Sequence, residues 1–148
     1  MPTSGPINNR RESLGFVLSD VARLMRRNFK QRLKDSCLTH GQARVLVHTS
    51  RNEGIRQVEL AEMLEVQPIT LARLLDQLAK VGLIERRADP KDRRAYHIYL
   101  MGAAAPHLAA IERVGKAIHK TVLRDLTERQ AALVFGALRK MRDNLASP

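Results

Sequence analysis

The segment Val66–Leu100 constrains the fold of this chain more than any other part of the sequence. It carries leucines at the i, i+3, i+4, i+7 spacing of one buried helix face. These leucines are Leu71, Leu74, Leu75 and Leu78. Pro68 fits the first helical position, where its missing N–H costs nothing, and Gly82 can end the helix in the left-handed conformation. The segment therefore predicts an amphipathic helix over residues 67–81 with one buried face.

Two short strands and a basic turn are predicted directly after this helix. Residues Leu83–Arg86 and Tyr96–Leu100 have strand character, and the second run alternates apolar and polar side chains. Asp89–Asp92 has the composition of a turn. The hairpin tip, residues 86–94, holds five basic residues against two acidic ones. A helix followed by a hairpin with a basic tip is typical of a DNA-binding module.

Helices account for most of the remaining chain. Ser13 can cap a first helix that extends to about Asp35. Thr39 and Gln42 have the spacing of a capping box, which begins a second helix running to about Thr49. Ile55 can form a single strand residue. Further helices are expected over residues 57–64, from 105 to about 123, and from a second capping box at 127 and 130 onward. The predicted fold is mainly α, in the order α-α-α-α-β-β-α-α.

Composition limits the class of partner. The 148 residues make one domain and carry a formal net charge of +11. A charge this high favours a polyanion such as DNA, RNA or an anionic membrane surface, although a merely basic surface is the simpler alternative. Aromatic residues make up only 3% of the chain. Because single-strand binders use aromatic side chains to stack bases, duplex DNA is the favoured partner.

The helices predicted over residues 57–64 and 67–81 have the lengths and tight connection of a helix-turn-helix. With the leucines buried, the second helix exposes side chains of types that read base edges in a major groove. They are Gln67, Ile69, Thr70, Arg73 and Gln77, with Lys80 at the end. Any surface helix exposes such residues, so the pattern gains its weight from the basic hairpin that follows.

The hairpin supplies the second group of candidate DNA contacts. Its candidate residues are Arg86, Arg87, Lys91, Asp92, Arg93 and Arg94. Narrow minor grooves concentrate negative potential and attract arginines. The alternative is a solvated hairpin with local Asp–Arg pairs. Both are expected to apply, with Asp92 holding one arginine in position while another reaches the groove.

These motifs resemble the MarR/SlyA family of winged helix-turn-helix regulators. The run DPKDRRAYHIYL is similar to the family's D-x-x-D-x-R-x-x-x-x-x-L signature, with Asp92, Arg94 and Leu100 on signature positions. LARLLDQLAKVGLIER resembles the family's recognition helix and places Arg73 at its DNA-facing arginine, and QVELAEMLEV resembles the helix before it. One departure is Met101–Pro106, where the family has Thr and a Lys-Gly turn, so the start of the next helix is open.

The resemblance implies an obligate homodimer whose first and last two helices interleave. The chain then divides into a flexible tail (1–12), dimerisation helices (13–37 and 103–148) and a winged helix-turn-helix part (38–102), all in one domain (13–148). The last helix carries apolar residues at helix-packing spacing. They are Val134, Leu138, Met141 and Leu145. Packing within one chain is the alternative explanation for such a stripe.

Many members of this family bind small aromatic or phenolic anions, and binding weakens their hold on DNA. His40, Arg44 and His48 lie at i, i+4, i+8 on the second predicted helix, where the family's pocket lies, and could meet a carboxylate. An ordinary polar helix face is the simpler alternative. No cofactor is expected, and the five scattered histidines do not indicate a metal site.

Other functions are less well supported. No Gly-rich phosphate loop, nucleophile elbow or HExxH motif is present, so the chain is not expected to be an enzyme. Cys37, the single cysteine, excludes an intrachain disulfide, fits the cytoplasm, and is expected to be a packed, inert thiol. Neither a membrane span nor a signal peptide is expected. The sequence predicts a dimeric transcriptional regulator of double-stranded DNA, and a sequence-tolerant architectural DNA-binding protein is the alternative.

Overall fold

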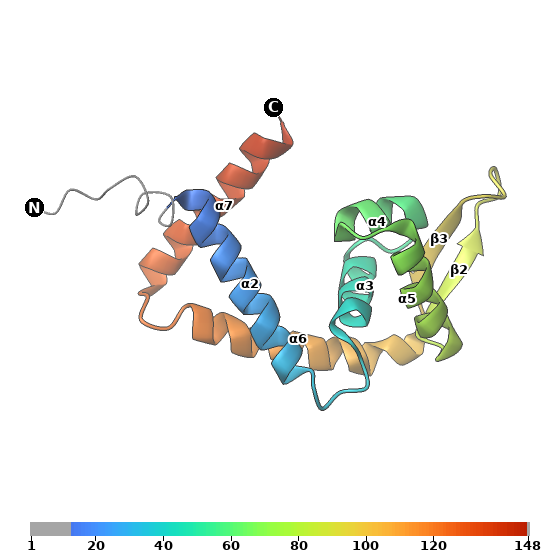
Figure 1. Cartoon of the computed structure of the whole chain (residues 1–148), viewed down its shortest axis with the longest axis horizontal. Coiled ribbons are helices and arrows are strands. Elements are labelled where there is room, and N and C mark those ends of the chain that lie inside the picture. Colours follow the sequence, from blue (N-terminus) through green and yellow to red (C-terminus); the bar gives the residue numbers. More distant parts are fainter. Residues whose placement is uncertain (1–12, 148) are drawn as a thin grey trace, which may run out of the picture.

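The computed structural model describes residues 13–147, so the tail predicted at residues 1–12 lies outside the described part. Figure 1 shows α6 running along the base of the molecule. Helices α2 and α7 rise from one end, and α3, α4, α5 and a β-hairpin stand over the other. The elements are α2 (Leu14–Arg32), α3 (His40–Arg51), β1 (Ile55–Arg56), α4 (Gln57–Leu64), α5 (Pro68–Lys80), β2 (Ile84–Ala88), β3 (Tyr96–Leu100), α6 (Ala105–Val122) and α7 (Glu128–Ala146).

The predicted mainly α, winged helix-turn-helix fold is confirmed, with two additions. Ile55 extends into a two-residue strand, β1, which pairs with β3. A 3-10 turn at Gly102–Ala104 fills the region where the start of the next helix was open, and α6 then begins at Ala105. Pro106 lies in the first turn of α6, where proline interrupts no helical hydrogen bond.

Local signals place most helix starts correctly. Both predicted capping boxes form, because the side chains of Thr39 and Thr127 accept from the backbone N–H groups of Gln42 and Gln130, and those glutamines accept in return. The first helix ends at Arg32, three residues earlier than predicted. The reason is tertiary: the next residue, Leu33, is buried in the core as the chain turns away.

The sheet is small and antiparallel, with strand order β1-β3-β2. Its inner face presents Ile55, Ile84 and Ile98, all buried, to the helices. Gly54, just before β1, has φ +84°, and a Cβ there would lie 3.1 Å from the Tyr99 hydroxyl oxygen. Glycine therefore suits this turn for two reasons: it adopts a positive φ without strain, and it has no side chain to crowd Tyr99.

The hydrophobic core lies between the helix-turn-helix, the sheet and the first part of α6. Of the predicted leucine stripe, Leu71, Leu75 and Leu78 are fully buried, and Leu74 packs partly buried at its edge. Burying a leucine side chain stabilises a fold by roughly 1.5–3 kcal/mol, so this stripe fixes how α5 sits on the molecule.

Helices α2 and α7 differ from the rest, because neither contains a buried residue. Most of their large apolar side chains are exposed instead, although Phe29 of α2 packs half-buried against the core. On α2 they are Leu14, Phe16, Val17, Leu18, Val21, Leu24 and Met25, and on α7 they are Leu133, Val134, Phe135, Leu138, Met141 and Leu145. Across residues 13–147, no helix combines the length and the apolarity that crossing a membrane would require.

Candidate nucleic-acid interface

The turn between α4 and α5 fixes the geometry of the helix-turn-helix. Glu65 follows α4 in the left-handed conformation, with φ +54°, and its backbone N–H donates to the Ala61 and Glu62 carbonyl oxygens in the last turn of the helix. The N–H of Val66 also donates to the Ala61 carbonyl oxygen, at 3.1 Å. Pro68 then begins α5 at once. This short, hydrogen-bonded connection sets the direction in which α5 follows α4.

The face of α5 opposite the buried leucines is open to solvent. The predicted reading residues Gln67, Ile69, Thr70, Arg73 and Gln77 are all exposed. Ile69 is 73% exposed, an unusual setting for an isoleucine in a folded domain. Gln77 also accepts a hydrogen bond from the side-chain amide of Gln42 at 3.0 Å, which ties this end of α5 to α3. The structure thus brings the five residues onto one accessible surface.

The loop between β2 and β3 forms the wing. Two aspartates hold it through backbone amides: Asp89 Oδ1 accepts from the Lys91 N–H at 2.8 Å, and Asp92 Oδ1 accepts from the Arg94 N–H at 3.0 Å. Asp92 was expected to hold one wing arginine in position, and in this structure its bond is to the backbone N–H of Arg94. The side chains of Lys91, Arg93 and Arg94 are exposed at the tip.

Two of the candidate wing arginines are engaged within the protein. Arg86 lies on the inner face of the sheet, and its guanidinium donates to the Asp76 carboxylate at 2.7 Å and to the Ala72 carbonyl oxygen at 3.0 Å. Arg87 lies on the outer face, where it pairs with Glu85 and stacks 3.8 Å above the centre of the Tyr99 ring. The free basic charge of the wing is therefore concentrated at its tip.

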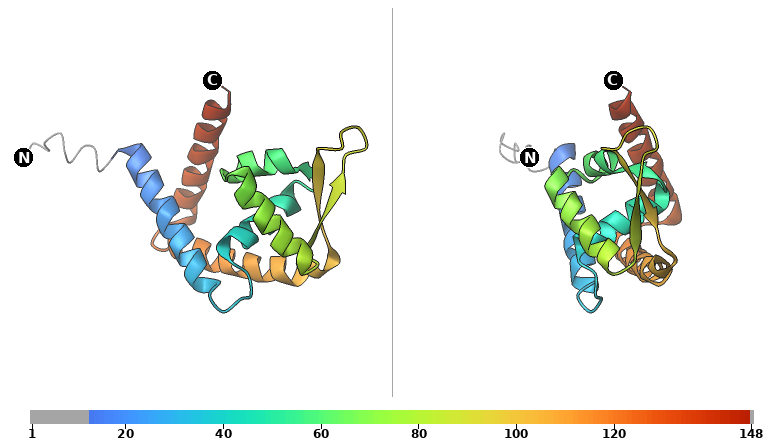
Figure 2. Two further views of the ribbon diagram at one scale, coloured as in Figure 1. Left: turned by 45° about the vertical axis from the view of Figure 1, so that its right-hand side comes forward. Right: turned by 90° about the vertical axis from the view of Figure 1, so that its right-hand side faces the viewer.

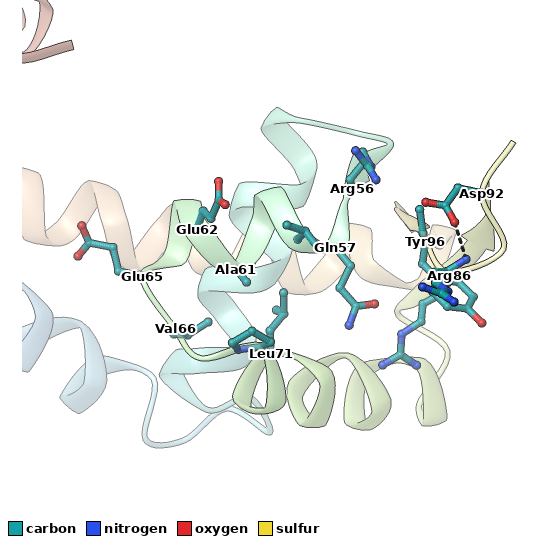
Figure 3. Close-up of a pocket in the computed structure, with 14 residues that line it drawn as sticks. Arg56, Gln57, Ala61, Glu62, Glu65, Val66, Leu71, Arg86, Asp92 and Tyr96 are labelled. Atoms are coloured by element: carbon teal, nitrogen blue, oxygen red, sulfur yellow. Dashed lines mark hydrogen bonds between the residues drawn. The ribbon is translucent and has the colours of Figure 1, made fainter. Parts of the chain in front are cut away.

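A hollow of about 950 Å³ separates α4, the start of α5 and the wing. Figure 3 shows Arg56, Arg86, Asp92 and Tyr96 gathered at its wing end, while Glu62 and Glu65 lie at the other end, along α4. Arg94 also lines it. The wing end is thus the basic end, and an anion such as a backbone phosphate would meet that end first.

A second hollow, of about 720 Å³, lies between the end of α2, α3 and α6. It contains all three residues of the predicted ligand group, His40, Arg44 and His48. Sequence reasoning missed the other lining residues, including Arg51 at the end of α3 itself. Most of the others come from helices distant in the chain, and they include Phe29, Leu108, Ile111, Lys116 and His119. Only folding brings α2 and α6 beside α3, so local spacing could not identify them.

The positive charge in this second hollow comes from arginine and lysine rather than histidine, and Glu112, which pairs with Lys116 at 3.4 Å, adds a negative charge. Burial, and then the nearby Lys30, lower the pKa of His40, and burial and Arg44 lower the pKa of His48. Both rings are therefore mostly neutral near pH 7. Arg44 also donates to the Leu64 carbonyl oxygen at 3.1 Å, which links the hollow to the helix-turn-helix.

Cys37 is exposed, so the expectation of a packed thiol was wrong. It lies in the turn between α2 and α3, where the flanking Leu33 and Leu38 take the buried positions and leave Cys37 pointing outward. Within residues 13–147, no group of three or more His, Cys, Asp or Glu side chains is arranged to hold a metal ion.

Known proteins share the fold described above, with its helix-turn-helix and wing. A MarR family model matches residues 38–96, which contain the helix-turn-helix and most of the wing. The crystal structure of a MarR is 30% identical, with a TM-score of 0.83 over 93% of each chain. A cysteine-to-serine mutant of MarR from E. coli, solved with operator DNA, is 28% identical, with a TM-score of 0.74 over 90% of this chain and 96% of its own. The transcriptional regulator SlyA is 27% identical, with a TM-score of 0.73 over 87% and 91%. The winged helix-turn-helix, its exposed reading face and these similarities show that the chain belongs to the MarR family of transcriptional regulators.

Proposed function

We propose that this chain is a homodimeric, sequence-specific regulator that reads an inverted repeat in double-stranded DNA. The observation that supports it best is the exposed face of α5, which is held by a buried leucine stripe and flanked by a basic wing. A helix placed this way can enter a major groove. Arg73 lies at the centre of this face and can form two hydrogen bonds with a guanine edge.

The wing reaches the adjacent minor groove in this proposal. Lys91, Arg93 and Arg94 carry the charge that its tip would bring to DNA, because their side chains are exposed. We assign Arg86 a different role: its bonds to Ala72 and Asp76 hold α5 against the sheet, so it positions the reading helix rather than touching DNA. Asp92 shapes the tip through its bond to the Arg94 backbone.

The exposed apolar faces of α2 and α7 support the dimer. A groove between α2 and α6 is lined by Val21, Leu24, Met25, Ile118 and Val122, together with Asn28 and Thr121. Exposed apolar surface on this scale marks an interface, and a second copy of the chain offers a matching apolar surface through two-fold symmetry. Deleting α7 after Thr127 should therefore remove both the dimer and tight DNA binding.

A small aromatic anion is the proposed modulator, with the second hollow as its site. Phe29, Leu108 and Ile111 offer an apolar lining for a ring, and Arg44 offers charge for a carboxylate, whereas Lys116 is paired with Glu112 of the same lining. Benzoate should bind and weaken the protein's hold on DNA, whereas benzamide, which has the same shape without the charge, should not. Equal effects of the two probes, or benzoate binding unchanged by Arg44→Met, would reject this site.

An architectural, sequence-tolerant DNA-binding protein is the alternative, since it would also be basic. The two functions differ in whether contacts to base edges add to contacts with phosphates. Fragments of the source genome retained by the protein at 0.15 M salt should share an inverted repeat and bind at least about 10³-fold more tightly than random DNA. A retained set without a common sequence would favour the architectural function.

A further inference from the structure

The ring of His97 joins two parts of the chain that the DNA-reading surface must keep in register. Its Nδ1 lies 2.8 Å from the Gly54 carbonyl oxygen, in the turn before β1. Its Nε2 lies 2.9 Å from Asp89 Oδ2, at the base of the wing. A carbonyl oxygen and a carboxylate oxygen both accept hydrogen bonds, so both ring nitrogens have to donate. Only the protonated imidazolium carries an N–H on each nitrogen.

Asp89 passes this connection on to the wing. While Oδ2 meets the ring, Oδ1 accepts from the Lys91 N–H, and the Asp89 N–H donates to the Ala95 carbonyl oxygen at 2.9 Å. The carboxylate therefore joins the ring directly to the first residues of the wing loop. Figure 2 shows the hairpin extending beyond the body of the molecule, so a small change at its base becomes a larger displacement at its tip.

We propose that His97 is a proton-dependent latch, a positioning residue that holds the base of the wing to the β1 turn in the orientation needed for DNA. The proposal rests on the DNA-binding function proposed above. When the ring loses its proton, one of its two nitrogens becomes an acceptor facing another acceptor. One contact is then lost, and the wing is held less firmly, by the β2–β3 pairing and the Asp89 N–H bond to Ala95.

The surrounding charges both favour and oppose the protonated ring. Arg56 on β1 and Arg87 on β2 are the residues paired with His97 across the sheet, and Glu53 lies beside the turn, where its carboxylate accepts from the Leu100 N–H. The bond to Asp89, followed by the bond to Gly54, raises the pKa of His97, although Arg56 acts against it. The bond to His97 in turn lowers the pKa of Asp89.

The direction of the pH dependence follows from these shifts. Because the pKa of His97 is raised on folding, its contribution is fully present below the ordinary histidine value of about 6.5 and is lost as pH rises through the higher folded value. Because the pKa of Asp89 is lowered, its contribution is lost only as pH falls through that lowered value. The latch is therefore closed at pH values between the folded pKa of Asp89 and that of His97, and it opens when pH rises above the folded pKa of His97. DNA phosphates near the wing would favour the closed form further.

Two substitutions separate a proton-dependent latch from simple packing. Asp89→Asn offers an amide NH₂ that can donate to a neutral Nε2, while its oxygen still accepts from the Lys91 N–H. The contacts at residue 89 are then retained without the extra proton. His97→Gln has one donor and one acceptor group at its end, which cannot satisfy two acceptors spaced as Gly54 and Asp89 are.

The first measurement uses the free protein, so it does not depend on DNA binding. Nitrogen NMR of the His97 ring across pH 5–9 should show the wild-type ring losing its second proton with a midpoint above pH 6.5, the ordinary histidine value. The midpoint should fall in Asp89→Asn, where the amide NH₂ can donate to Nε2 of the neutral ring but would face the N–H of the cation. A wild-type midpoint at the ordinary value, unchanged by Asp89→Asn, would overturn the latch.

The second measurement is the operator Kd at fixed salt between pH 6 and 9. Wild-type affinity for the operator should fall as pH rises. If DNA binding raises the pKa of one His97 ring by one unit, the total fall in affinity is roughly tenfold. The profile should flatten in Asp89→Asn, and His97→Gln should bind weakly at every pH. Equal slopes for wild type and Asp89→Asn would reject the link to DNA. A protein that retained no DNA at all would reject the proposed function, and the ring titration would still decide the latch.

Discussion

Apolar side chains are buried at one end of this molecule and exposed at the other. In the helix-turn-helix end, Leu71, Leu75 and Leu78 are fully buried within the chain. At the other end, α2 and α7 have comparable apolar stripes but no buried residue. The difference indicates that the reading module completes its own core, whereas the terminal helices depend on surface supplied from elsewhere. We attribute that surface to a second copy of the chain.

The largest effect is expected from a charge placed on the α7 stripe. Leu138→Glu would bury a carboxylate in the proposed dimer seam twice, once per subunit, and burying an unpaired charge costs several kcal/mol. The dimer dissociation constant should rise roughly 1000-fold or more, since each 1.4 kcal/mol is tenfold. Analytical ultracentrifugation measures it.

The matched control is Ala132→Glu, which adds the same charge at a position about 120° around α7 from Leu138. Ala132 lies outside the stripe of Val134, Leu138, Met141 and Leu145, so the dimer should persist in the control. If Leu138→Glu and Ala132→Glu dimerise equally well, the exposed stripe of α7 is not the seam.

A smaller effect is expected at the reading face. Arg73→Ala should weaken operator binding by about 1–3 kcal/mol per half-site and relax the preference at one base position. Dimerisation should be unchanged, because Arg73 is exposed on α5, at the other end of the molecule from α2 and α7 (Figure 1). Binding to a panel of single-base operator variants measures this. A uniform loss over all sequences would make Arg73 a phosphate contact instead.

The Arg86 contacts should matter for the stability of the reading module. Arg86→Met retains much of the side-chain volume but loses the bonds to Asp76 and to the Ala72 carbonyl. A loss of about 1–2 kcal/mol in the free energy of unfolding is expected, because the Arg86 side chain is only 23% exposed. Asp76→Ala keeps the Ala72 bond and should cost less. Urea unfolding at fixed protein concentration compares the two, and equal losses would show that the Ala72 bond contributes little.

The smallest effect is expected at the wing tip. Arg94→Ala should cost about 1 kcal/mol of binding and reduce the salt slope by about one unit per half-site, because one fewer charge neutralises DNA phosphate. The loss should be larger beside A·T-rich flanks, where the minor groove is narrower and more negative. Binding isotherms at several salt concentrations measure both quantities. An unchanged salt slope would place the Arg94 side chain away from DNA.

Much of the fold could be predicted because its signals are local. The leucine spacing in α5 and the two capping boxes each involve residues within one or two helical turns, and the structure confirms them. The end of α2 was predicted too late in the chain. Leu33 is buried in the core, and no local sequence signal reveals this burial.

The finer geometry of the site depends on contacts between distant residues. The ring of His97 is hydrogen-bonded to the carbonyl oxygen of Gly54, 43 positions away in the sequence. The side chains of Gln42 and Gln77, 35 positions apart, are also hydrogen-bonded. The sequence identified Arg86 as basic and near the tip, but strand alternation alone did not show that it faces Asp76. Likewise, Phe29 and Lys116 join the second hollow only through the packing of α2 and α6 against α3.

The most direct test of the central claim is the spacing between the two half-sites of the operator. A two-fold dimer with one α5 in each of two successive major grooves needs half-site centres about one helical turn, ~34 Å, apart. Inserting about five base pairs turns one half-site to the far side of the duplex, and binding should fall to the level of random DNA. Undiminished affinity after the insertion would contradict the account.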